Sequence, residues 1–255
     1  MLVDVKRVEV VGVPVDCVDV PVTHRTVGDI LSGAAGGNII AVNPEKVMRA
    51  RSDPRLLDAL RGARLLIPDG IGVVLAARIL GLGRMSRVPG SELMPAICEI
   101  AAREGKGVFL FGASPEVNAM VAQILPERYP GLRIAGRHHG YVKDDEMPSL
   151  IDEINRSRAD VLFVALGSPK QEYWMAENGP RLNVRTCQGV GGTFDVIAGR
   201  IKRAPALFIN LHLEWLYRLL SQPSRAGRQK ALPQFALMIL REWFAQLLIP
   251  ARRSR

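Results

Sequence analysis

Cysteine is scarce in this chain of 255 residues, and its three copies stand far apart. They are Cys17, Cys98 and Cys187, with no CxxC pair and no cluster of cysteine with histidine. Structural zinc sites and disulfide frameworks both need closely organised cysteines. The sequence therefore argues against either, and it predicts a reduced, cytoplasmic setting.

Long apolar runs are also missing. No stretch approaches the roughly 20 apolar residues that a membrane-spanning helix needs. The first ten residues, MLVDVKRVEV, lack the continuous apolar core of a signal peptide. We therefore expect no export signal and no transmembrane segment, so any association with a membrane should be peripheral.

Common cofactor and metal motifs are absent as well. There is no GxxxxGK[ST] phosphate loop, and no GxGxxG with an acid closing a neighbouring strand, so the sequence favours neither a P-loop nor an NAD site. His138 and His139 have no third ligand at metal-binding spacing. No DxD pair is present to hold a divalent cation against a diphosphate. A bound diphosphate is therefore expected to meet arginines and helix N-termini, with no metal and no cofactor.

Aromatic residues make up only 5% of the chain, and excess positive charge is confined to its end. Residues 1–199 carry 23 Lys or Arg and 23 Asp or Glu, whereas residues 200–255 carry 11 and 2, which accounts for the whole net charge of +9. A neutral body with few aromatics argues against a nucleic-acid partner. The basic end favours contact with an anionic surface.

The basic end also contains an amphipathic segment, residues 234–249. Its few polar side chains form a narrow wedge: Gln234, Arg241, Glu242 and Gln246. A broad apolar face with basic flanks is typical of helices that lie on a membrane surface. We predict a core at residues 1–199 and a basic helical appendage at residues 200–255, which binds the anionic inner face of the membrane. Docking of this helix on the core or on a second copy, as in a homo-oligomer, is the alternative.

From residue 37 onward, short apolar runs alternate with longer helical patterns. Strands are expected at 37–43, 64–69, 107–112, 132–141, 160–167 and 184–192. Helices are expected at 44–63, 70–81, 91–105, 115–131, 144–159 and 169–182. Strands that are apolar on both faces predict an α/β fold, with a Rossmann-like, mostly parallel sheet covered by helices on both sides. Residues 1–36 are expected to add an edge hairpin and a short helix.

Polar and small residues follow these strands at their carboxyl ends. They are Asn43, Asp69, Gly112 to Ser114, Gly167 to Lys170, and Gly189 to Asp195. Ligands of such sheets gather beyond the carboxyl ends of the strands. Five strand ends that meet at one rim therefore predict a ligand site.

Several residues of this rim have both a functional and a structural interpretation. Gln171 is a donor suited to sugar hydroxyls or phosphates, although a well-capped helix explains the same stretch. Asp195 can accept from a ribose or sugar hydroxyl, or it can cap the short helix that follows. Tyr141, at a strand end, can stack on a base. Ser114 suits a helix N-cap, and the N–H groups beyond it can hold phosphate.

Six blocks of sequence together resemble one family. They are NPEK (43–46), PDGIG (68–72), RVPGSEL (87–93), ALGSPKQEYW (165–174), GVGGTFDVIAGRIKRAP (189–205), and LEWLYRL (213–219) with Arg225 and Arg228. In this order, spread over residues 37–228, they resemble the WecG/TagA/CpsF glycosyltransferases. The resemblance implies an inverting, metal-independent transferase of bacterial cell-surface polysaccharide or teichoic acid synthesis. It would move a sugar of the N-acetylmannosamine type from a UDP-sugar to a sugar on a polyprenyl diphosphate.

The resemblance also assigns roles to individual residues. It implies that Asp69 is the catalytic base and that Arg87 is an active-site arginine. The implied substrate-binding residues are Asn43 and Gln171 for the donor sugar, Tyr141 and Asp195 for the uridine, and Arg218, Arg225 and Arg228 for the diphosphate. Ala41 stands where the family often has Thr, and Glu92 where Asp is common, so the donor sugar stays open.

The chemistry of Asp69 fits the implied role. An inverting transfer needs a base to take the proton of the acceptor hydroxyl, and a carboxylate at a strand end can do so. Asp is also a favoured helix N-cap, which is the structural alternative for this residue. At the level of the whole protein, a non-catalytic module that binds a nucleotide-sugar or a lipid diphosphate at the membrane is the alternative function.

Overall fold

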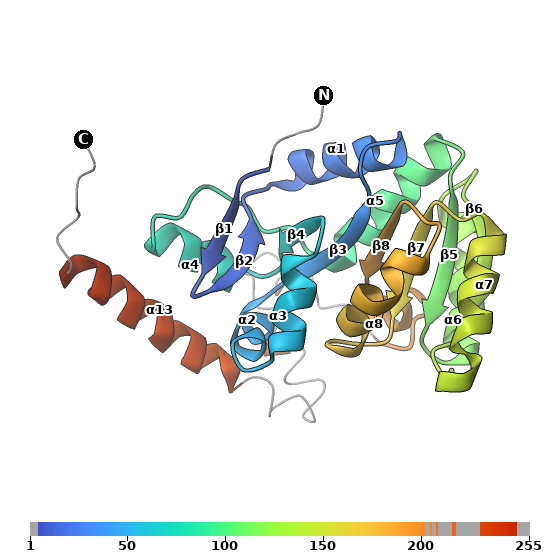
Figure 1. The fold of residues 1–255 in the computed structure, drawn as a ribbon. Helices are drawn as coiled ribbons and strands as arrows, with labels where there is room; N and C mark the ends of the chain where they lie inside the picture. The colour runs from blue at the N-terminus through green and yellow to red at the C-terminus, as the bar shows by residue number, and fades with distance from the viewer. Residues whose placement is uncertain (1–4, 202–204, 206–207, 209–215, 218–229, 249–255) are drawn as a thin grey trace.

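The structure is a computed structural model that describes residues 5–201, 205, 208, 216–217 and 230–248. Its centre is a six-stranded sheet in the order β4-β3-β8-β7-β5-β6, in which every neighbouring pair is parallel (Figure 1). The strands are β3 (Gly37–Val42), β4 (Leu65–Pro68), β5 (Gly107–Gly112), β6 (Arg133–His138), β7 (Val161–Ala165) and β8 (Thr186–Gly189). The predicted parallel α/β sheet is confirmed.

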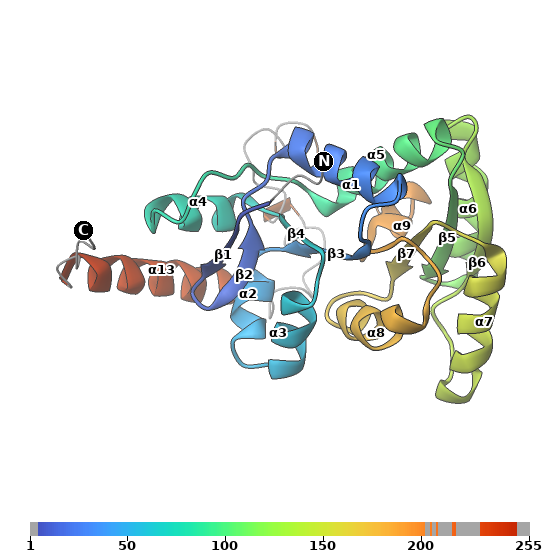
Figure 2. The same cartoon turned by 45° about the horizontal axis from the view of Figure 1, so that its top comes forward.

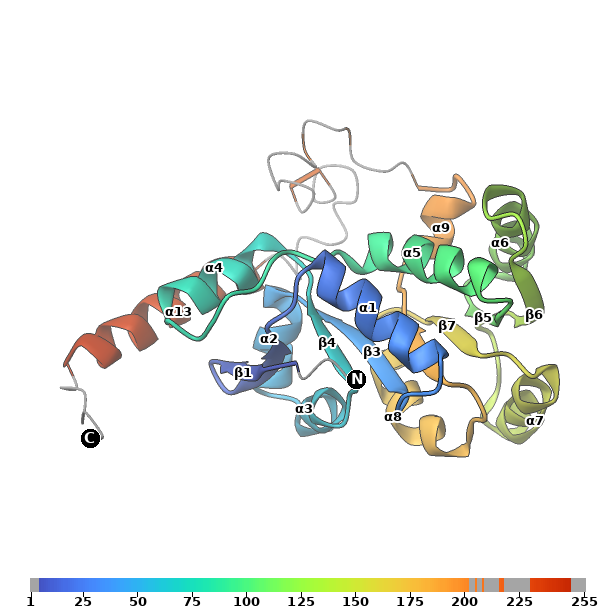
Figure 3. The same cartoon turned by 90° about the horizontal axis from the view of Figure 1, so that it is seen from above.

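Helices cover both faces of this sheet, as Figure 3 shows from above. One face packs against α2 (Pro44–Ala50), α3 (Pro54–Arg61), α7 (Met147–Ser157) and α8 (Lys170–Asn178). The other face packs against α1 (Val20–Leu31), α5 (Gly90–Arg103), α6 (Pro115–Arg128) and α9 (Thr193–Ile197). Alternate side chains of one strand enter the two cores, since Phe109 and Phe111 join the first and Val108 and Leu110 the second. Two buried faces explain why β5 and β7 are apolar throughout.

The N-terminal segment forms the predicted hairpin and helix, but neither strand of the hairpin pairs with the edge strand of the main sheet. Strands β1 (Arg7–Val10) and β2 (Val13–Asp16) make a separate two-stranded antiparallel sheet. The buried Asp16 carboxylate accepts hydrogen bonds from Arg7 at 2.7 and 3.0 Å and from the Leu66 amide of the edge strand at 2.8 Å. A side chain therefore covers part of the edge of β4, which limits pairing with another chain.

One predicted helix, 44–63, is wrong because the chain forms two helices there. Asp53 ends the first helical region and caps α3 by accepting from the Leu56 amide at 3.0 Å, and Pro54 follows at the first helical position. Tyr173 of α8 donates a hydrogen bond to the same carboxylate. That hydrogen bond, the largest of several causes, lowers the pKa of Asp53.

The three cysteines are free, as their spacing predicted. Cys98 and Cys187 are buried, and burial raises the pKa of each thiol to about 12. Cys17, which is partly exposed, also has a raised pKa because of burial. These thiols are therefore poor nucleophiles and contribute mainly to packing.

Two 3-10 helices and two further α-helices belong to the described part of the chain. The 3-10 helices η1 (Asp144–Glu146) and η2 (Gly179–Arg181) adjoin α7 and α8. Helix α4 (Ile71–Ile79) follows β4, and α13 (Ala231–Leu248) confirms the predicted C-terminal helix. α13 packs on α2 and α4 through the buried Phe235 and Ile239, and Figure 2 shows α4 and α13 projecting from the same end of the molecule. Among the described residues, no helix is long and apolar enough to cross a membrane.

Candidate active site

The parallel sheet brings the carboxyl ends of all six strands to one rim. Asn43 and Asp69 follow the neighbouring strands β3 and β4, whose last paired residues are Val42 and Pro68. The Asp69 amide donates to the Val42 carbonyl oxygen at 2.8 Å. A Cβ on Gly70 would lie 3.9 Å from the Asn43 Cβ. The structure therefore brings these two predicted site residues together.

Asn43 has a structural role that fixes its position. Its Oδ1 accepts the Lys46 amide at 2.8 Å and so caps α2, with Pro44 at the first helical position. Only the side-chain oxygen Oδ1 of Asn43 takes part in this cap, and the Nδ2 group does not. Capping and donor binding are thus compatible roles for the same side chain.

Asp69 stands where a second helix begins. The Val88 amide donates to the Pro68 carbonyl oxygen at 2.8 Å, which places Arg87 and the start of α5 beside the end of β4. A Cβ on Gly90 would lie 3.9 Å from Oδ2 of Asp69. The N-terminal end of a long helix carries partial positive charge, which favours a carboxylate there.

The N-cap alternative for Asp69 is not what the structure shows. The N-cap residue of α4 is Gly70, with φ +112°, a region that favours glycine. Asp69 stands one position earlier and is partly exposed on the rim. A partly exposed carboxylate next to a glycine with no side chain suits close approach of a substrate.

Gln171 lies in the first turn of α8 and is 4% exposed. Its Oε1 accepts the Gly191 amide at 3.0 Å, and its Nε2 donates to Glu172 Oε1 at 3.1 Å. The amide also packs on the end of β8, where a Cβ on Gly189 would come within 2.6 Å of Nε2. Gln171 therefore holds the glycine turn after β8 in place.

Asp195 follows that glycine turn. It lies within the first turn of α9, whose N-cap is Gly192, and it is partly exposed. The alternative of Asp195 as the N-cap of this helix is therefore wrong. A Cβ on Gly192 would lie 3.9 Å from Asp195 Oδ2, so the carboxylate lies beside the glycine turn, and α9 packs against α6.

The turn after β5 is held by hydrogen bonds and leads into the start of α6. Ser114 caps α6 by accepting the Val117 amide at 3.3 Å, as the sequence predicted. Ala113 has φ +57°, and its carbonyl oxygen accepts the Gly140 amide at 2.8 Å. Hydrogen bonds from the Glu116 amide itself and from Ser114 lower the pKa of Glu116, with smaller contributions from nearby Arg200 and His139.

Tyr141 lies beyond β6, at the far edge of the sheet, and is 71% exposed. Five strand spacings separate β4 from β6, which corresponds to about 24 Å at about 4.8 Å each. The structure therefore separates Tyr141 from Asp69 and Asn43, and places it next to the turn that follows β5. The three arginines assigned to a diphosphate, Arg218, Arg225 and Arg228, lie outside the described residues.

Sequence reasoning missed three buried polar side chains that support the rim. Asn118 donates to the carbonyl oxygens of Leu110, Gly112 and His138 at 3.0–3.1 Å and so joins the ends of β5 and β6. Lys46 and Glu172 form a buried ion pair at 2.6 Å. For Lys46 and Glu172, the available signal was a charged residue on a helix face that is otherwise apolar. Lys46 stands four residues before the buried Ala50, and Glu172 stands three before the buried Met175.

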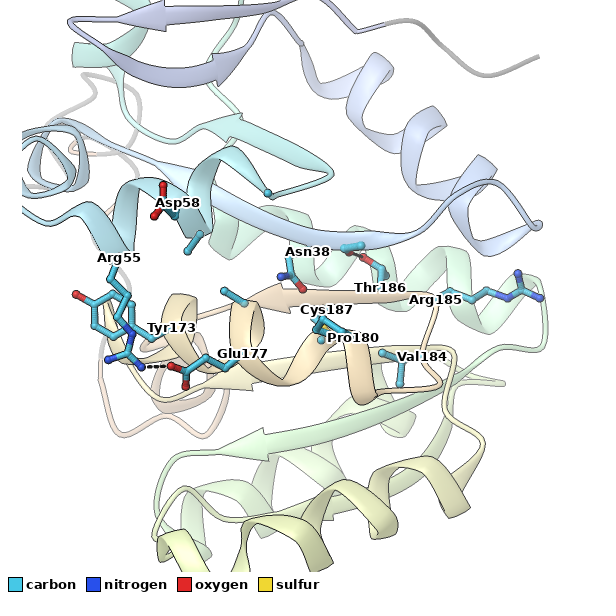
Figure 4. Close-up of a pocket in the computed structure, with 15 residues that line it drawn as sticks. Asn38, Arg55, Asp58, Tyr173, Glu177, Pro180, Val184, Arg185, Thr186 and Cys187 are labelled. Atoms are coloured by element: carbon cyan, nitrogen blue, oxygen red, sulfur yellow. Dashed lines mark hydrogen bonds and ion pairs between the residues drawn. The ribbon is translucent and has the colours of Figure 1, made fainter.

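A cavity of about 670 Å³ lies away from this rim, between α3 and α8 and near the amino ends of β3 and β8 (Figure 4). Its walls include Asn38, Thr186 and Cys187 at the strand starts. Arg55 stacks 4.4 Å from the centre of the Tyr173 ring and pairs with Glu177. None of the predicted site residues lines it, so the candidate site is the rim and not this cavity. Among the described residues, no three His, Cys, Asp or Glu side chains are grouped to hold a metal ion.

A parallel sheet covered on both faces, with a carboxylate, an amide and a glycine turn at its carboxyl rim, is an α/β fold of the class that binds ligands at this rim. Residues 8–248 match the model of the glycosyl transferase WecG/TagA/CpsF family. The chain belongs to this family and is a glycosyltransferase.

Curated relatives agree with this assignment. The chain is 38% identical over 206 residues to an N-acetylglucosaminyldiphosphoundecaprenol N-acetyl-beta-D-mannosaminyltransferase of Bacillus spizizenii, covering 81% of this chain and 79% of the relative. It is 34% identical over 235 residues to a protein of the same name from Staphylococcus aureus, covering 91% of this chain and 92% of that relative. The similarity therefore extends over about four fifths or more of each chain.

Proposed function

We propose that this chain transfers an N-acetylmannosamine-type sugar from a UDP-sugar to N-acetylglucosamine carried on a polyprenyl diphosphate, with inversion, at the inner face of a bacterial membrane. The relatives named above are, by their names, N-acetyl-beta-D-mannosaminyltransferases that act on N-acetylglucosaminyldiphosphoundecaprenol. The observation that carries the proposal for this chain is the placement of Asp69 beside Asn43 at adjacent strand ends, under the start of α5.

Asp69 is the proposed base of a single displacement. Its carboxylate takes the proton of the acceptor hydroxyl as that oxygen attacks C1 of the donor sugar. The bond between C1 and the β-phosphate oxygen breaks, and its electron pair leaves with UDP. Arg87 lies beside the same strand end and stabilises the charge that develops on the leaving group.

The donor is proposed to lie along the rim from β4 toward β6. The sugar sits by Asn43 and Gln171, and the uridine extends toward Asp195 and Tyr141. The exposed ring of Tyr141 has the free face that stacking on a base requires. Because Gln171 is already bonded to Gly191 and Glu172, it acts on the donor with the remaining hydrogen of its Nε2 group and through the turn that it holds.

The segment 200–255 is proposed to act as one basic appendage that closes over the diphosphate. Arg218, Arg225 and Arg228 lie in it, and guanidinium groups bind diphosphates with paired hydrogen bonds. α13 links this appendage to the site, since its buried Phe235 lies 3.9 Å from the Cβ position of Gly72 in the first turn of α4, three residues after Asp69. Closure would thus occur next to the proposed base.

The direct test is a panel of UDP-sugars with a short-chain polyprenyl-diphosphate N-acetylglucosamine acceptor, with product mass as the readout. We expect UDP-N-acetylmannosamine to give a product heavier by one N-acetylhexosamine and an equal amount of released UDP. Binding of the UDP-sugar without UDP release would instead support the alternative, a non-catalytic binding module.

The apolar face of α13 supports the membrane placement. Its exposed side chains are Leu237, Leu240, Trp243, Phe244, Leu247 and Leu248, and α4 adds Leu75 and Ile79. These two helices leave the same end of the molecule (Figures 1 and 2). A group of exposed large apolar side chains marks an interaction site. The exposed Lys230 and Arg241, on or beside α13, suit anionic lipid.

Serine at both Leu237 and Phe244 is expected to reduce binding to phosphatidylglycerol vesicles at least tenfold. Burial of each side chain in the lipid boundary contributes roughly 1.5–3 kcal/mol, and both are exposed, so the fold should be retained. Flotation with vesicles measures the effect, and Gln246→Ser on the polar wedge is the matched control. Unchanged flotation of the double variant would contradict lipid contact, and conversion of a dimer to a monomer in ultracentrifugation would assign the face to a second copy.

Chelation is expected to leave the transfer rate within about twofold of the untreated enzyme. The sequence has no DxD pair, and the proposed site stabilises the leaving diphosphate with arginines and helix N-termini. Initial rates with and without excess EDTA measure this. A loss of activity that Mg²⁺ or Mn²⁺ restores would show that transfer needs a metal ion.

A further inference from the structure

The ion pair between Lys46 and Glu172 joins two helices that begin at the rim. Lys46 Nζ lies 2.6 Å from Glu172 Oε1, and the side chains are 7% and 0% exposed. Lys46 belongs to α2, which follows β3, and Glu172 belongs to α8, which follows β7; β8 lies between these strands. The pair therefore bridges two halves of the rim across the middle of the sheet.

Glu172 determines how the neighbouring amide is oriented. Its Oε1 accepts from Lys46 and from Gln171 Nε2, while Oε2 has no hydrogen-bond partner among the described residues. With Nε2 held by the carboxylate, Oε1 of Gln171 faces the Gly191 amide. A flipped amide would place Nε2 against that N–H, so it would lose both hydrogen bonds.

Lys46 connects the same carboxylate to the other predicted donor residue. Its backbone amide is the hydrogen bond donor to Asn43 in the α2 cap. One residue therefore ties the loop after β3 to Glu172 through its side chain and to Asn43 through its main chain. The chain of contacts runs from Asn43 through Lys46 and Glu172 to Gln171 and ends at Gly191.

We infer that Lys46 and Glu172 are positioning residues for the donor half of the site, a role that rests on the proposed function. They set the orientation of Gln171 and its distance from Asn43, and they do not touch the substrate. Apolar residues of similar volume often stabilise a fold as well as a buried ion pair does, so stability alone does not require these two charges. Loss of the acceptor that Glu172 offers to Gln171 should act on donor binding and leave the base, Asp69, unaffected.

Two double variants of the full-length protein separate positioning from packing. Lys46→Met with Glu172→Leu removes both charges and the acceptor for Gln171, while Lys46→Met with Glu172→Gln removes both charges and keeps an acceptor oxygen. We expect the first to raise the KM for the UDP-sugar about tenfold or more, and the second to restore it to within about threefold of the wild-type value. The pH profile of kcat should be the same in both.

The matched control removes an exposed ion pair between α3 and α8. Arg55→Met with Glu177→Leu should leave the donor KM unchanged, because this pair lies by the cavity away from the rim. The inference would be overturned if the Lys46→Met, Glu172→Leu protein folds and its KM for the UDP-sugar equals that of the Lys46→Met, Glu172→Gln protein.

If the Lys46→Met, Glu172→Leu protein fails to fold, the variant Gly189→Ala tests the inference instead. Gly189→Ala adds a Cβ 2.6 Å from Gln171 Nε2 and displaces the amide with the ion pair intact, so the same rise in donor KM is expected. An unchanged KM in the folded Gly189→Ala protein would overturn the inference. If the wild-type protein transfers no sugar, the proposed function fails, and calorimetric binding of the UDP-sugar to the same variants still tests the positioning.

Discussion

Replacement of Asp69 with asparagine is expected to lower kcat by about 10²–10⁴-fold, the usual contribution of a general base. Asparagine has the same shape but cannot accept the proton of the acceptor hydroxyl. Asp69 follows β4, at the opposite edge of the sheet from the proposed uridine contact Tyr141. The affinity for UDP should therefore stay within about twofold. Steady-state kinetics with the lipid acceptor and calorimetry with UDP measure the two effects separately.

A control from the same half of the sheet separates this effect from surface charge. Asp58 is an exposed carboxylate on α3, 3.9 Å from Arg61, and it lines the cavity away from the rim. Asp58→Asn should leave kcat unchanged. A normal kcat in the Asp69→Asn protein would remove Asp69 from the role of base, and the membership of the family would stand without that mechanism.

Replacement of Lys46 alone with methionine is expected to lower the free energy of unfolding by about 3–5 kcal/mol. The substitution leaves the Glu172 carboxylate 0% exposed with no opposite charge beside it. The melting temperature should fall by about 2–4 °C for each kcal/mol in a protein of this size. Urea unfolding measures the loss, and a second change of Glu172 to leucine should recover most of it.

The control for this prediction is Arg55→Met. It breaks an ion pair whose side chains are 60% and 57% exposed, and such pairs contribute only about 0–1 kcal/mol. If Lys46→Met lowered the free energy of unfolding no more than Arg55→Met does, the burial of the Lys46–Glu172 pair would have no measurable effect on stability.

The parallel strands could be predicted from the sequence because burial on both faces makes a strand apolar throughout. The run DVLFVALG contains β7, all of whose residues are buried. The helix start at Ser114 could be predicted because capping is a local contact between residues three apart. Both features leave a signal within a few consecutive residues of the chain.

Two kinds of feature were missed: one whose local signal was obscured, and others that depend on partners distant in the chain. The break between α2 and α3 carries a local signal, Asp53 followed by Pro54, which the periodic apolar pattern around it obscured. The hairpin packs on the edge strand β4, as expected, but forms its own sheet, and the contact of Asp16 with Leu66 spans 50 residues and follows from no local pattern. The Lys46–Glu172 pair spans 126 residues, so its two charges look like ordinary polar positions of separate helices.

The sequence by itself determined the class of fold, the neutral body with a basic end, and the family, because these follow from local periodicity, charge counts and ordered motifs. Only the tertiary structure decided which of the candidate residues are neighbours. The strand order puts Asp69 beside Asn43 and puts Tyr141 at the opposite edge. Strand order is set by how the helices between strands pack on the two faces of the sheet, and that packing is a property of the whole core and not of any one segment.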